Sequence, residues 1–346
     1  MSLKLMKGNE ALSEAAVRAG CRFFGGYPIT PQSEILEYLS GRMAQVGGVF
    51  LQAESELAGV NMVYGAAAAG FRAMTSSSGP GFSLLQEGIS YITSAELPAV
   101  FVDVQRYGTG LGDIFQAQSD YFMATRGGGH GDYHLLVLAP ASVQESVDLT
   151  TLAFDKADEY RNPSLILSDA SIAQMMEPVQ LPEMRPVDAD KPWTVCGKHG
   201  GDFKRVTSTM YYIPDFDQYL RDKYARMAEN EQRWESVHTD DAEVVLVAYG
   251  ISARICKEAV QIARQRGMRV GLLRPISLWP FPVKAFAALK ADRFLTVELS
   301  ALPKLETDVR LAAPSASVEH FLGGMNIPES EAIVERAASL IAQRRS

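Results

Sequence analysis

The sequence has 346 residues, of which 47% are hydrophobic and 21% charged, and its formal net charge is −8. This length exceeds what one hydrophobic core usually holds, so we expect two domains. The acidic balance, without a basic patch, argues against a nucleic-acid partner, and no apolar stretch is long enough to span a membrane. Residues 1–17 contain no hydrophobic signal core, so we expect a cytoplasmic protein.

The first half of the sequence alternates apolar runs with amphipathic segments. The apolar runs predict strands at residues 21–25, 48–52, 72–76, 98–104, 134–140 and 163–169. The intervening segments predict helices at residues 8–20, 31–44, 55–70, 80–95 and 142–160. Continuous apolar strands that are separated by helices indicate a parallel sheet with helices on both faces, so we expect an α/β fold.

Local signals support several of these helix boundaries. Gly20 is placed as a C-terminal stop, and Ser142 with Glu145 has the S-x-x-E spacing of a capping box. Thr30 followed by Pro31 predicts an N-cap with proline as the first helical residue.

The pattern changes in the middle of the chain and then resumes. We expect a first domain at residues 1–180, an extended linker with a helix at 181–240, and a second α/β domain at 241–346. The proline-rich, charged segment "EPVQLPEMRPVDADKPW" at 177–193 leads into the linker, which then contains a solvated helix at 215–238. Apolar strands and helices return with "AEVVLVAYG".

Polar segments follow several of the expected parallel strands. They are "YPITP" at 27–31, "QAESE" at 52–56, "SSSGPG" at 76–81 and "QRYGTGLGD" at 105–113. Ligands bind beyond the carboxyl ends of the strands in an open parallel sheet. We therefore expect these segments to meet at one candidate site.

These residues favour ligand binding to different degrees. Arg106 ends an apolar strand beside glycines, which is typical of a clamp for a carboxylate. Glu54 and Glu56 lie at a helix start, where the helix dipole favours a carboxylate by roughly 0.3–1 kcal/mol, so either one can be purely structural. The segment 76–81 can hold an anion on its free N–H groups, or it can be an ordinary strand-to-helix turn.

The cysteines and histidines do not indicate a metal site in this chain. The three cysteines, Cys21, Cys196 and Cys256, lie far apart without a CxxC pair, so we expect buried free thiols and no disulfide, zinc or iron–sulfur site. His130 and His134 in "RGGGHGDYH" lack the spacing of metal ligands.

Several segments together resemble the alpha subunit of the 2-oxoacid:ferredoxin oxidoreductases, which are thiamine diphosphate enzymes. These segments are "GGYPITPQSE", "QAESELAGVNMVYGAAAAG", "MTSSSGPGFSLLQEGISYITSAELP", "VDVQR" and "LAPASVQE". The resemblance runs from Lys7 to Val179 and continues more loosely through "RPISLWPFP" into the second domain. "GGGHGDY" and "QAQSDYF" are most similar to the branched-chain (2-ketoisovalerate) type, with the 2-oxoglutarate type next.

The resemblance implies a thiamine diphosphate-binding fold of the pyrimidine type, followed by a domain similar to the transketolase C-terminal domain. It implies that Glu56 hydrogen-bonds the aminopyrimidine ring and so maintains the imino tautomer that takes the proton from the thiazolium carbon. It implies that Arg106 binds the substrate carboxylate and that Thr30 lies against the substrate carbonyl and the cofactor. Further cofactor contacts are expected from Tyr27, Pro28, Ile29, Ser77 and Ser78.

The resemblance also implies that the chain carries only the pyrimidine half of an active site. The diphosphate and Mg²⁺ are expected on a beta subunit, and iron–sulfur clusters only in partner subunits, possible further partners being gamma and ferredoxin-like delta subunits. The implied reaction is the coenzyme A-dependent oxidative decarboxylation of a 2-oxoacid to acyl-CoA and CO₂, with reduction of ferredoxin. It can also run in reverse, as a carboxylation.

Other readings stay open at this point. The substrate can be 2-oxoglutarate or pyruvate, and the chain can be a subunit of a non-redox thiamine diphosphate enzyme or a non-catalytic scaffold. The joint presence of Thr30, Glu56 and Arg106 favours the oxidoreductase. The sequence offers no clear cationic partner for a second carboxylate of the substrate, which favours a branched-chain or other aliphatic side chain.

Overall fold

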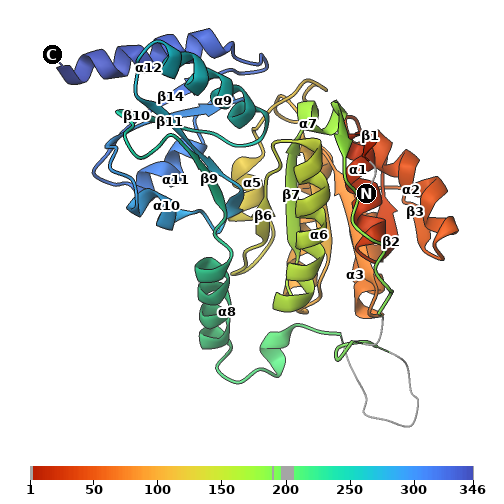
Figure 1. Ribbon diagram of the computed structural model, residues 1–346. Helices are drawn as coiled ribbons and strands as arrows, with labels where there is room; N and C mark the ends of the chain where they lie inside the picture. Colours follow the sequence, from red (N-terminus) through yellow and green to blue (C-terminus); the bar gives the residue numbers. More distant parts are fainter. Residues whose placement is uncertain (1–2, 189–190, 196–205, 346) are drawn as a thin grey trace.

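The computed structural model describes residues 3–188, 191–195 and 206–345 (Figure 1). Within these ranges the strands form sheets of seven, five and two strands. The seven-stranded sheet has the order β12-β6-β7-β5-β4-β2-β3, and the five-stranded sheet has the order β14-β13-β10-β11-β9. The expected α/β class is confirmed.

The first sheet is parallel except at one edge. Its strands are β2 (Cys21–Gly26), β3 (Val49–Gln52), β4 (Arg72–Ser77), β5 (Val100–Gln105), β6 (Leu136–Leu138), β7 (Ser164–Asp169) and β12 (Ser277–Trp279). Strands β2 to β7 run parallel to their neighbours, and β12 runs antiparallel to β6. The C-terminal half of the chain therefore returns one strand to the first sheet.

Helices cover both faces of this sheet (Figure 1). They are α1 (Gly8–Arg18), α2 (Ser33–Gln45), α3 (Glu56–Ala68), α4 (Pro80–Ser94), α5 (Tyr121–Arg126), α6 (Val143–Tyr160) and α7 (Ala170–Gln174). Apolar residues of α1, α2 and α6 pack with Val102 and Val104 of β5, and those of α3 and α4 pack with Phe101. Successive residues of β5 thus reach opposite layers, which explains its unbroken apolar sequence around Asp103.

The second sheet is also covered on both sides. Its strands are β9 (Trp234–Val237), β10 (Val244–Val247), β11 (Val270–Pro275), β13 (Arg293–Glu298) and β14 (Ser317–Leu322). Helices α9 (Gly250–Gln265) and α12 (Ser330–Arg345) share one core cluster with it. Helices α10 (Val283–Ala287) and α11 (Leu305–Ala312) contribute to the same core as α3, α4 and α5, so apolar packing is continuous between the two sheets.

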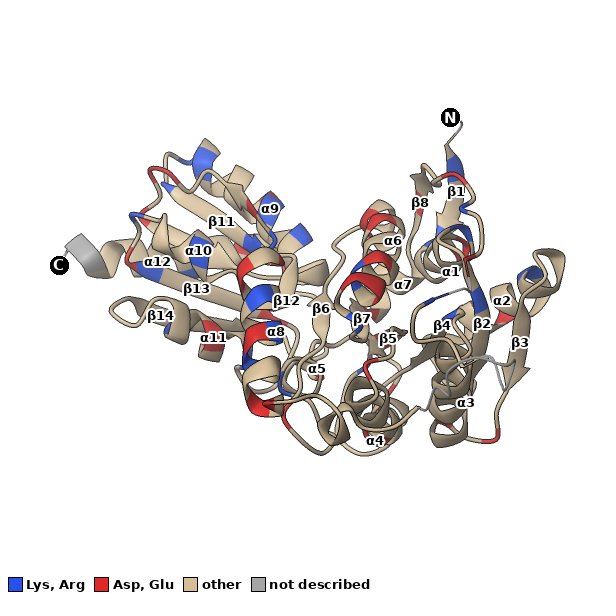
Figure 2. Cartoon of the chain, turned by 90° about the horizontal axis from the view of Figure 1, so that it is seen from below, with Lys and Arg blue, Asp and Glu red and all other residues tan. Residues whose placement is uncertain are grey.

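The segment before the second sheet packs against the first sheet's domain. Helix α8 (Phe216–Asn230) shows alternating acidic and basic residues in Figure 2. Its Lys223 is nonetheless buried and lies 3.2 Å from Glu96, and the Tyr224 ring packs edge-on against Trp279. The expected helix at 215–238 is therefore shorter and less solvated than predicted, because these contacts fix one face and residues 234–237 join β11 as an edge strand. The domain division at residues 180 and 240 stays a prediction.

The segment around Thr30 differs from its sequence-based prediction. The Gln32 N–H donates to the Ile29 carbonyl oxygen at 3.1 Å, which closes a turn over Thr30 and Pro31, and the peptide bond between these two is cis. Helix α2 begins only at Ser33, with Gln32 at the N-cap position. The prediction that Thr30 caps this helix, with Pro31 as its first residue, is wrong because the turn occupies both residues. Ser142 does cap α6, since its Oγ accepts from the Glu145 N–H at 3.1 Å.

Three further findings concern membrane spans, free thiols and metal sites in the described residues. No helix among them is both long and apolar enough for a membrane span. Cys21 and Cys256 are buried free thiols, and Cys196 lies outside the described residues. In the same ranges, no group of three or more His, Cys, Asp and Glu side chains could hold a metal ion.

Candidate active site

Glu56 points into the protein at the carboxyl edge of the first sheet. It is the first residue of α3 and is 4% exposed, whereas Glu54 is exposed. The Ser77 hydroxyl donates to Glu56 Oε1 at 3.1 Å. A Cβ on Gly81 would collide with both of these oxygens, so glycine is required for the pair to form. The structure therefore selects Glu56 as the buried carboxylate of the "AESE" segment.

The serine-rich turn after β4 lies beside this carboxylate. Ser77 ends β4 and Ser78 is fully buried, and the Ser78 hydroxyl has no hydrogen-bond partner among the described residues. An unpaired buried polar group costs about 1–3 kcal/mol, so a bound ligand or water is needed to satisfy it. Gly79 then turns the chain into α4 with a φ of +51°.

Arg106 lies just beyond the end of β5 and is 7% exposed. Its Nη1 donates to the Thr30 carbonyl oxygen at 2.9 Å, and its Nη2 donates to the Leu111 carbonyl oxygen. Its Nε is buried without a partner, and no ion pair to Arg106 occurs among the described residues. The guanidinium is thus a buried cation held by two carbonyl oxygens, and among the described residues no carboxylate lies within ion-pair distance of it.

The "YPITP" segment forms the outer side of this edge. Tyr27, Pro28 and Thr30 are exposed, and Ile29 is half-buried. Gln32 holds the segment, because its Nε2 donates to the Tyr27 carbonyl oxygen at 3.0 Å and its Oε1 accepts from the Ser76 hydroxyl at 2.7 Å. Gln32 was not identified from the sequence, because a polar residue at the start of a helix does not by itself indicate a ligand site.

A groove adjoins Thr30 on this edge. It has a volume of about 430 Å³. Its walls are formed by Thr30, Pro31, Ser33, Glu34, Ile114, Phe115, Gln116, Ala170, Ser171 and Gln174. Burial alone would raise the pKa of Glu34, but hydrogen bonds from Gln174 and Asn9 hold that pKa below its usual value. The groove therefore combines an ionised carboxylate with apolar side chains of the 107–115 loop.

Two further carboxyl groups lie behind Arg106. Asp103 is fully buried in β5, and the side chain of Asp120 is within hydrogen-bond reach of it. Burial, together with the neighbouring Asp120, raises the pKa of Asp103 well above its usual value, and burial raises the pKa of Asp120 to about 6. The sequence signal for this pair was the acidic residue inside the apolar run "VFVDVQ", which our sequence interpretation did not use.

The second domain is anchored to the same edge. The Gln118 side chain donates to the Tyr249 carbonyl oxygen at 2.8 Å and accepts from the Ser252 hydroxyl at 2.7 Å. Asp169, at the end of β7, accepts from the Ile251 N–H at 2.8 Å, and burial raises the pKa of this aspartate to about 6. These contacts fix the loop that follows Arg106.

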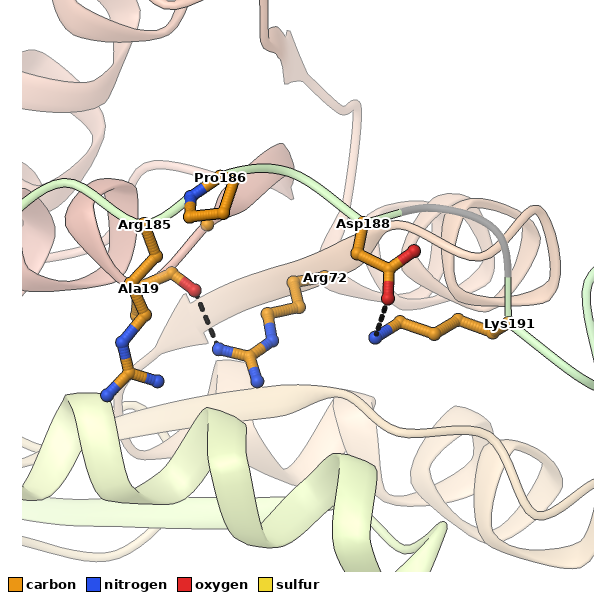
Figure 3. A pocket seen from close by; sticks show the side chains of 7 residues that line it. Ala19, Arg72, Arg185, Pro186, Asp188 and Lys191 are labelled. Carbon is orange, nitrogen blue, oxygen red and sulfur yellow. Dashed lines mark hydrogen bonds and ion pairs between the residues drawn. The ribbon is translucent and has the colours of Figure 1, made fainter.

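A separate pocket lies at the opposite end of β4 (Figure 3). Arg72 begins that strand, and its Nη1 donates to the Ala19 carbonyl oxygen at 2.6 Å. The same guanidinium binds Asp155 and Asp158, each at 2.9 Å. The positive charge of Arg72 is balanced by Asp155 and Asp158, and the pocket lies at the amino ends of the strands. We therefore interpret this pocket as a structural junction.

The structure brings most of the predicted residues together. Glu56 bonds Ser77, Arg106 bonds the backbone of Thr30, and Gly79 lies against Arg106 with a would-be Cβ 3.2 Å from Nε. One patch of the carboxyl edge therefore contains a buried carboxylate, an unpaired hydroxyl and an unpaired cation. The roles of these residues stay predictions.

Family models match most of the chain. Residues 14–235 match the model described as pyruvate flavodoxin/ferredoxin oxidoreductase, thiamine diphosphate-binding, and residues 242–329 match pyruvate:ferredoxin oxidoreductase core domain II. Both matches follow the order of the two sheets in the structure.

Curated relatives match over nearly the full length. The chain is 50% identical to the ketoisovalerate oxidoreductase subunit VorB of Methanothermobacter thermautotrophicus, with 97% of each chain covered. It is 37% identical to the 2-oxoglutarate synthase subunit KorA of Methanocaldococcus jannaschii, over 87% of this chain and 89% of the relative. Both relatives are named as subunits, which indicates a multi-subunit enzyme.

Solved structures support the same assignment. The 2-oxoglutarate:ferredoxin oxidoreductase of Magnetococcus marinus, solved with 2-oxoglutarate, coenzyme A and succinyl-CoA, superposes with a TM-score of 0.86 at 26% identity. That match covers 98% of this chain and 65% of the other. A split-gene transketolase (TM-score 0.57, 15% identity) shares the fold. The resemblance expected from the motifs is confirmed, and the chain belongs to the 2-oxoacid:ferredoxin oxidoreductase family as a subunit of the alpha type with a thiamine diphosphate-binding domain.

Proposed function

We propose that this chain is the alpha subunit of a 2-ketoisovalerate:ferredoxin oxidoreductase, which converts a branched-chain 2-oxoacid and coenzyme A to acyl-CoA and CO₂. The observation that carries the proposal is the buried Arg106 guanidinium, held by two carbonyl oxygens and lacking an anion. A 2-oxoacid supplies the missing anion as its carboxylate. Arginine suits this role because its planar donors match a carboxylate.

The buried residues around Glu56 fit the pyrimidine half of thiamine diphosphate. When bound, this cofactor supplies the nucleophilic carbon and takes up the electron pair that CO₂ leaves behind. Glu56 has one oxygen bonded to Ser77, which leaves the other for the ring N–H of an aminopyrimidine. The unpaired Ser78 hydroxyl is a further group for the ring to satisfy. Tyr27, Pro28 and Ile29 are placed by Gln32 to line the outer side.

The groove beside Thr30 supports a branched-chain side chain over a dicarboxylate. Neither lysine nor arginine is among the described residues that line it, and Ile114 and Phe115 offer apolar surface. The lowered pKa of Glu34 keeps this residue charged, and its carboxylate is already paired with Lys7 at 3.3 Å, so Lys7 is engaged and is not a free cation for a second substrate carboxylate. The name of the VorB relative points to the same substrate class.

The proposed enzyme needs partner chains. We assign the diphosphate, Mg²⁺ and at least one iron–sulfur cluster to a beta subunit, with gamma and ferredoxin-like delta subunits as further components. Ferredoxin is the proposed electron acceptor, and the cytoplasm is the proposed location. Only Cys21 and Cys256 are described, both buried, and neither is grouped with other metal-ligating side chains in the described residues.

The test is to purify the native complex and assay a panel of 2-oxoacids with coenzyme A and a viologen as electron acceptor. We expect kcat/KM to be highest with 2-ketoisovalerate or a close branched-chain analogue, and viologen reduction to require coenzyme A. A preference for 2-oxoglutarate or pyruvate would contradict the substrate assignment. CO₂ release without electron transfer would contradict the reaction type.

A further inference from the structure

We propose that Asp103 and Asp120 share a single proton and act as positioning residues for Arg106. The proposal rests on the proposed function only in taking the ligand of Arg106 to be the carboxylate of a 2-oxoacid. Neither aspartate was part of the site that the sequence predicted.

The geometry around the two carboxyl groups requires a proton. Both oxygens of Asp103 and Oδ2 of Asp120 are buried without an ordinary hydrogen-bond partner among the described residues. Two ionised carboxylates can only accept hydrogen bonds, so neither would find a donor in the other side chain and the two would repel each other. One proton turns one carboxyl group into a donor to the other. A shared proton is the arrangement that carboxyl pairs in low-dielectric sites adopt.

The pair lies directly behind the candidate site. Asp103 is the register partner of Ser77, the residue that hydrogen-bonds Glu56. The backbone N–H of Gly79 faces Asp103, and a Cβ on Gly79 would lie 3.2 Å from Arg106 Nε. The side chain of Gln105 accepts from the Asp120 N–H at 3.2 Å, which ties Asp120 to the end of β5. Movement of either carboxyl group would therefore move the Gly79 turn and the guanidinium.

The number of protons on Asp103 and Asp120 also sets the negative charge close to Arg106. Asp120 interacts electrostatically with Arg106 and with Lys304 of the second domain. If both carboxyl groups were ionised, the second negative charge would weaken the attraction of Arg106 for a substrate anion. With one shared proton, the pair carries one negative charge instead of two, so Arg106 keeps more of its attraction for a carboxylate.

Other titratable groups face the pair from neighbouring elements. Tyr249, at the end of β10, lies near Asp120, and burial raises its pKa well above the usual value, so it stays neutral. Glu298 and Asp169 face Tyr249 from β13 and β7, and burial raises the pKa of both. A change of pH alone would therefore titrate several groups, so the test compares matched variants at a fixed pH.

The first measurement detects the proton directly, without enzyme activity. Infrared spectra of the complex at pH 8 are compared for the wild type, Asp103→Asn, Asp120→Asn and the surface control Asp132→Asn. We expect the carbonyl stretch of a protonated carboxyl group in the wild type and the control, and its loss in both pair variants. Absence of this band in the wild type, or its persistence in both pair variants, would overturn the proposal.

The second measurement tests the positioning role through KM. Asparagine at 103 still donates to Asp120, so we expect the KM for the 2-oxoacid to stay within about twofold of the wild type. Asp103→Leu leaves Asp120 without a donor, and we expect the same KM to rise about fivefold or more while the KM for coenzyme A is unchanged. Equal 2-oxoacid KM values for the leucine variant and the wild type would overturn the positioning role. If the leucine variant fails to assemble, Asp103→Asn decides alone, since a fivefold loss there contradicts the proposal.

The two proposals fail in distinguishable ways. A wild-type complex that turns over no 2-oxoacid contradicts the proposed function, whereas the infrared band still reports the shared proton. An active complex without that band contradicts only the inference about Asp103 and Asp120.

Discussion

The guanidinium of Arg106 packs against the backbone of Gly79, where a Cβ would lie 3.2 Å from Arg106 Nε. Gly79 also has a φ of +51°, which side chains other than glycine rarely adopt. Two independent constraints thus require glycine at the point where the serine turn meets the cation. The Arg106 side chain, which we assign to substrate binding, is thus positioned by the backbone of Gly79.

We expect Gly79→Ala to raise the KM for the 2-oxoacid about tenfold, because Arg106 must move away from the added methyl group. The strained φ should also lower the free energy of unfolding by about 1 kcal/mol. Steady-state kinetics and urea denaturation of the assembled complex measure the two effects. Gly47→Ala is the matched control, since its φ is +68° and its Cβ would meet nothing within 4 Å. A similar change in KM for both variants would show that backbone strain alone is responsible.

The two glutamates of "AESE" provide a second test. Glu56→Gln removes the ionisable group that we assign to the cofactor ring, and we expect turnover to fall at least about 100-fold. The amide is isosteric and still accepts from Ser77, so assembly and the melting temperature should change little. Glu54→Gln alters the same charge on an exposed residue and should keep wild-type turnover. Wild-type rates from Glu56→Gln would contradict the assigned role.

The sequence predicted which residues lie at the carboxyl edge of the sheet, but it did not predict the conformation of the turns there. Strand periodicity and the carboxyl-end rule placed Thr30, Glu56, Ser77 and Arg106 near one another, because parallel strands share one direction. The local cap prediction at Thr30 was wrong, since the turn closed by Gln32 depends on Ser76 in another strand. Contacts between residues far apart in the sequence are invisible to a local pattern.

The same limit applies to the choice between the two glutamates and to Asp103. Both Glu54 and Glu56 fit a helix start, and only the position of Gly81 and Ser77 decides which of them is buried. The acidic residue in the strand was visible in the sequence, but its partner Asp120 lies in a loop whose path follows from contacts of Gln118 with the second domain.

The contact between Arg274 and Glu145 joins strand β11 of the second sheet to helix α6, which covers the first sheet. Arg274 is 2% exposed and forms bonds of 2.7 Å from each terminal nitrogen to the Glu145 carboxylate. Arg274→Met leaves Glu145 and Glu235 without this partner, and because both carboxylates remain partly exposed we expect a loss of about 1–3 kcal/mol in the free energy of unfolding. Arg266→Met removes an exposed pair with Glu331 and should cost less than about 1 kcal/mol. Equal denaturation midpoints for the two variants would contradict the view that Arg274 stabilises the contact between β11 and α6.

The groove beside Thr30 predicts a change of substrate preference in Ile114→Lys. Ile114 lies in the loop after Arg106 and is exposed, so we expect the substitution to leave folding intact. A lysine there offers a cation to the second carboxylate of 2-oxoglutarate. An exposed ion pair contributes about 0.2–1 kcal/mol, so the ratio of kcat/KM for 2-oxoglutarate to that for 2-ketoisovalerate should rise by up to about fivefold. Ile114→Met keeps the apolar character and should leave the ratio unchanged. An unchanged ratio in Ile114→Lys would mean that the substrate side chain does not enter this groove and is enclosed by the partner subunit.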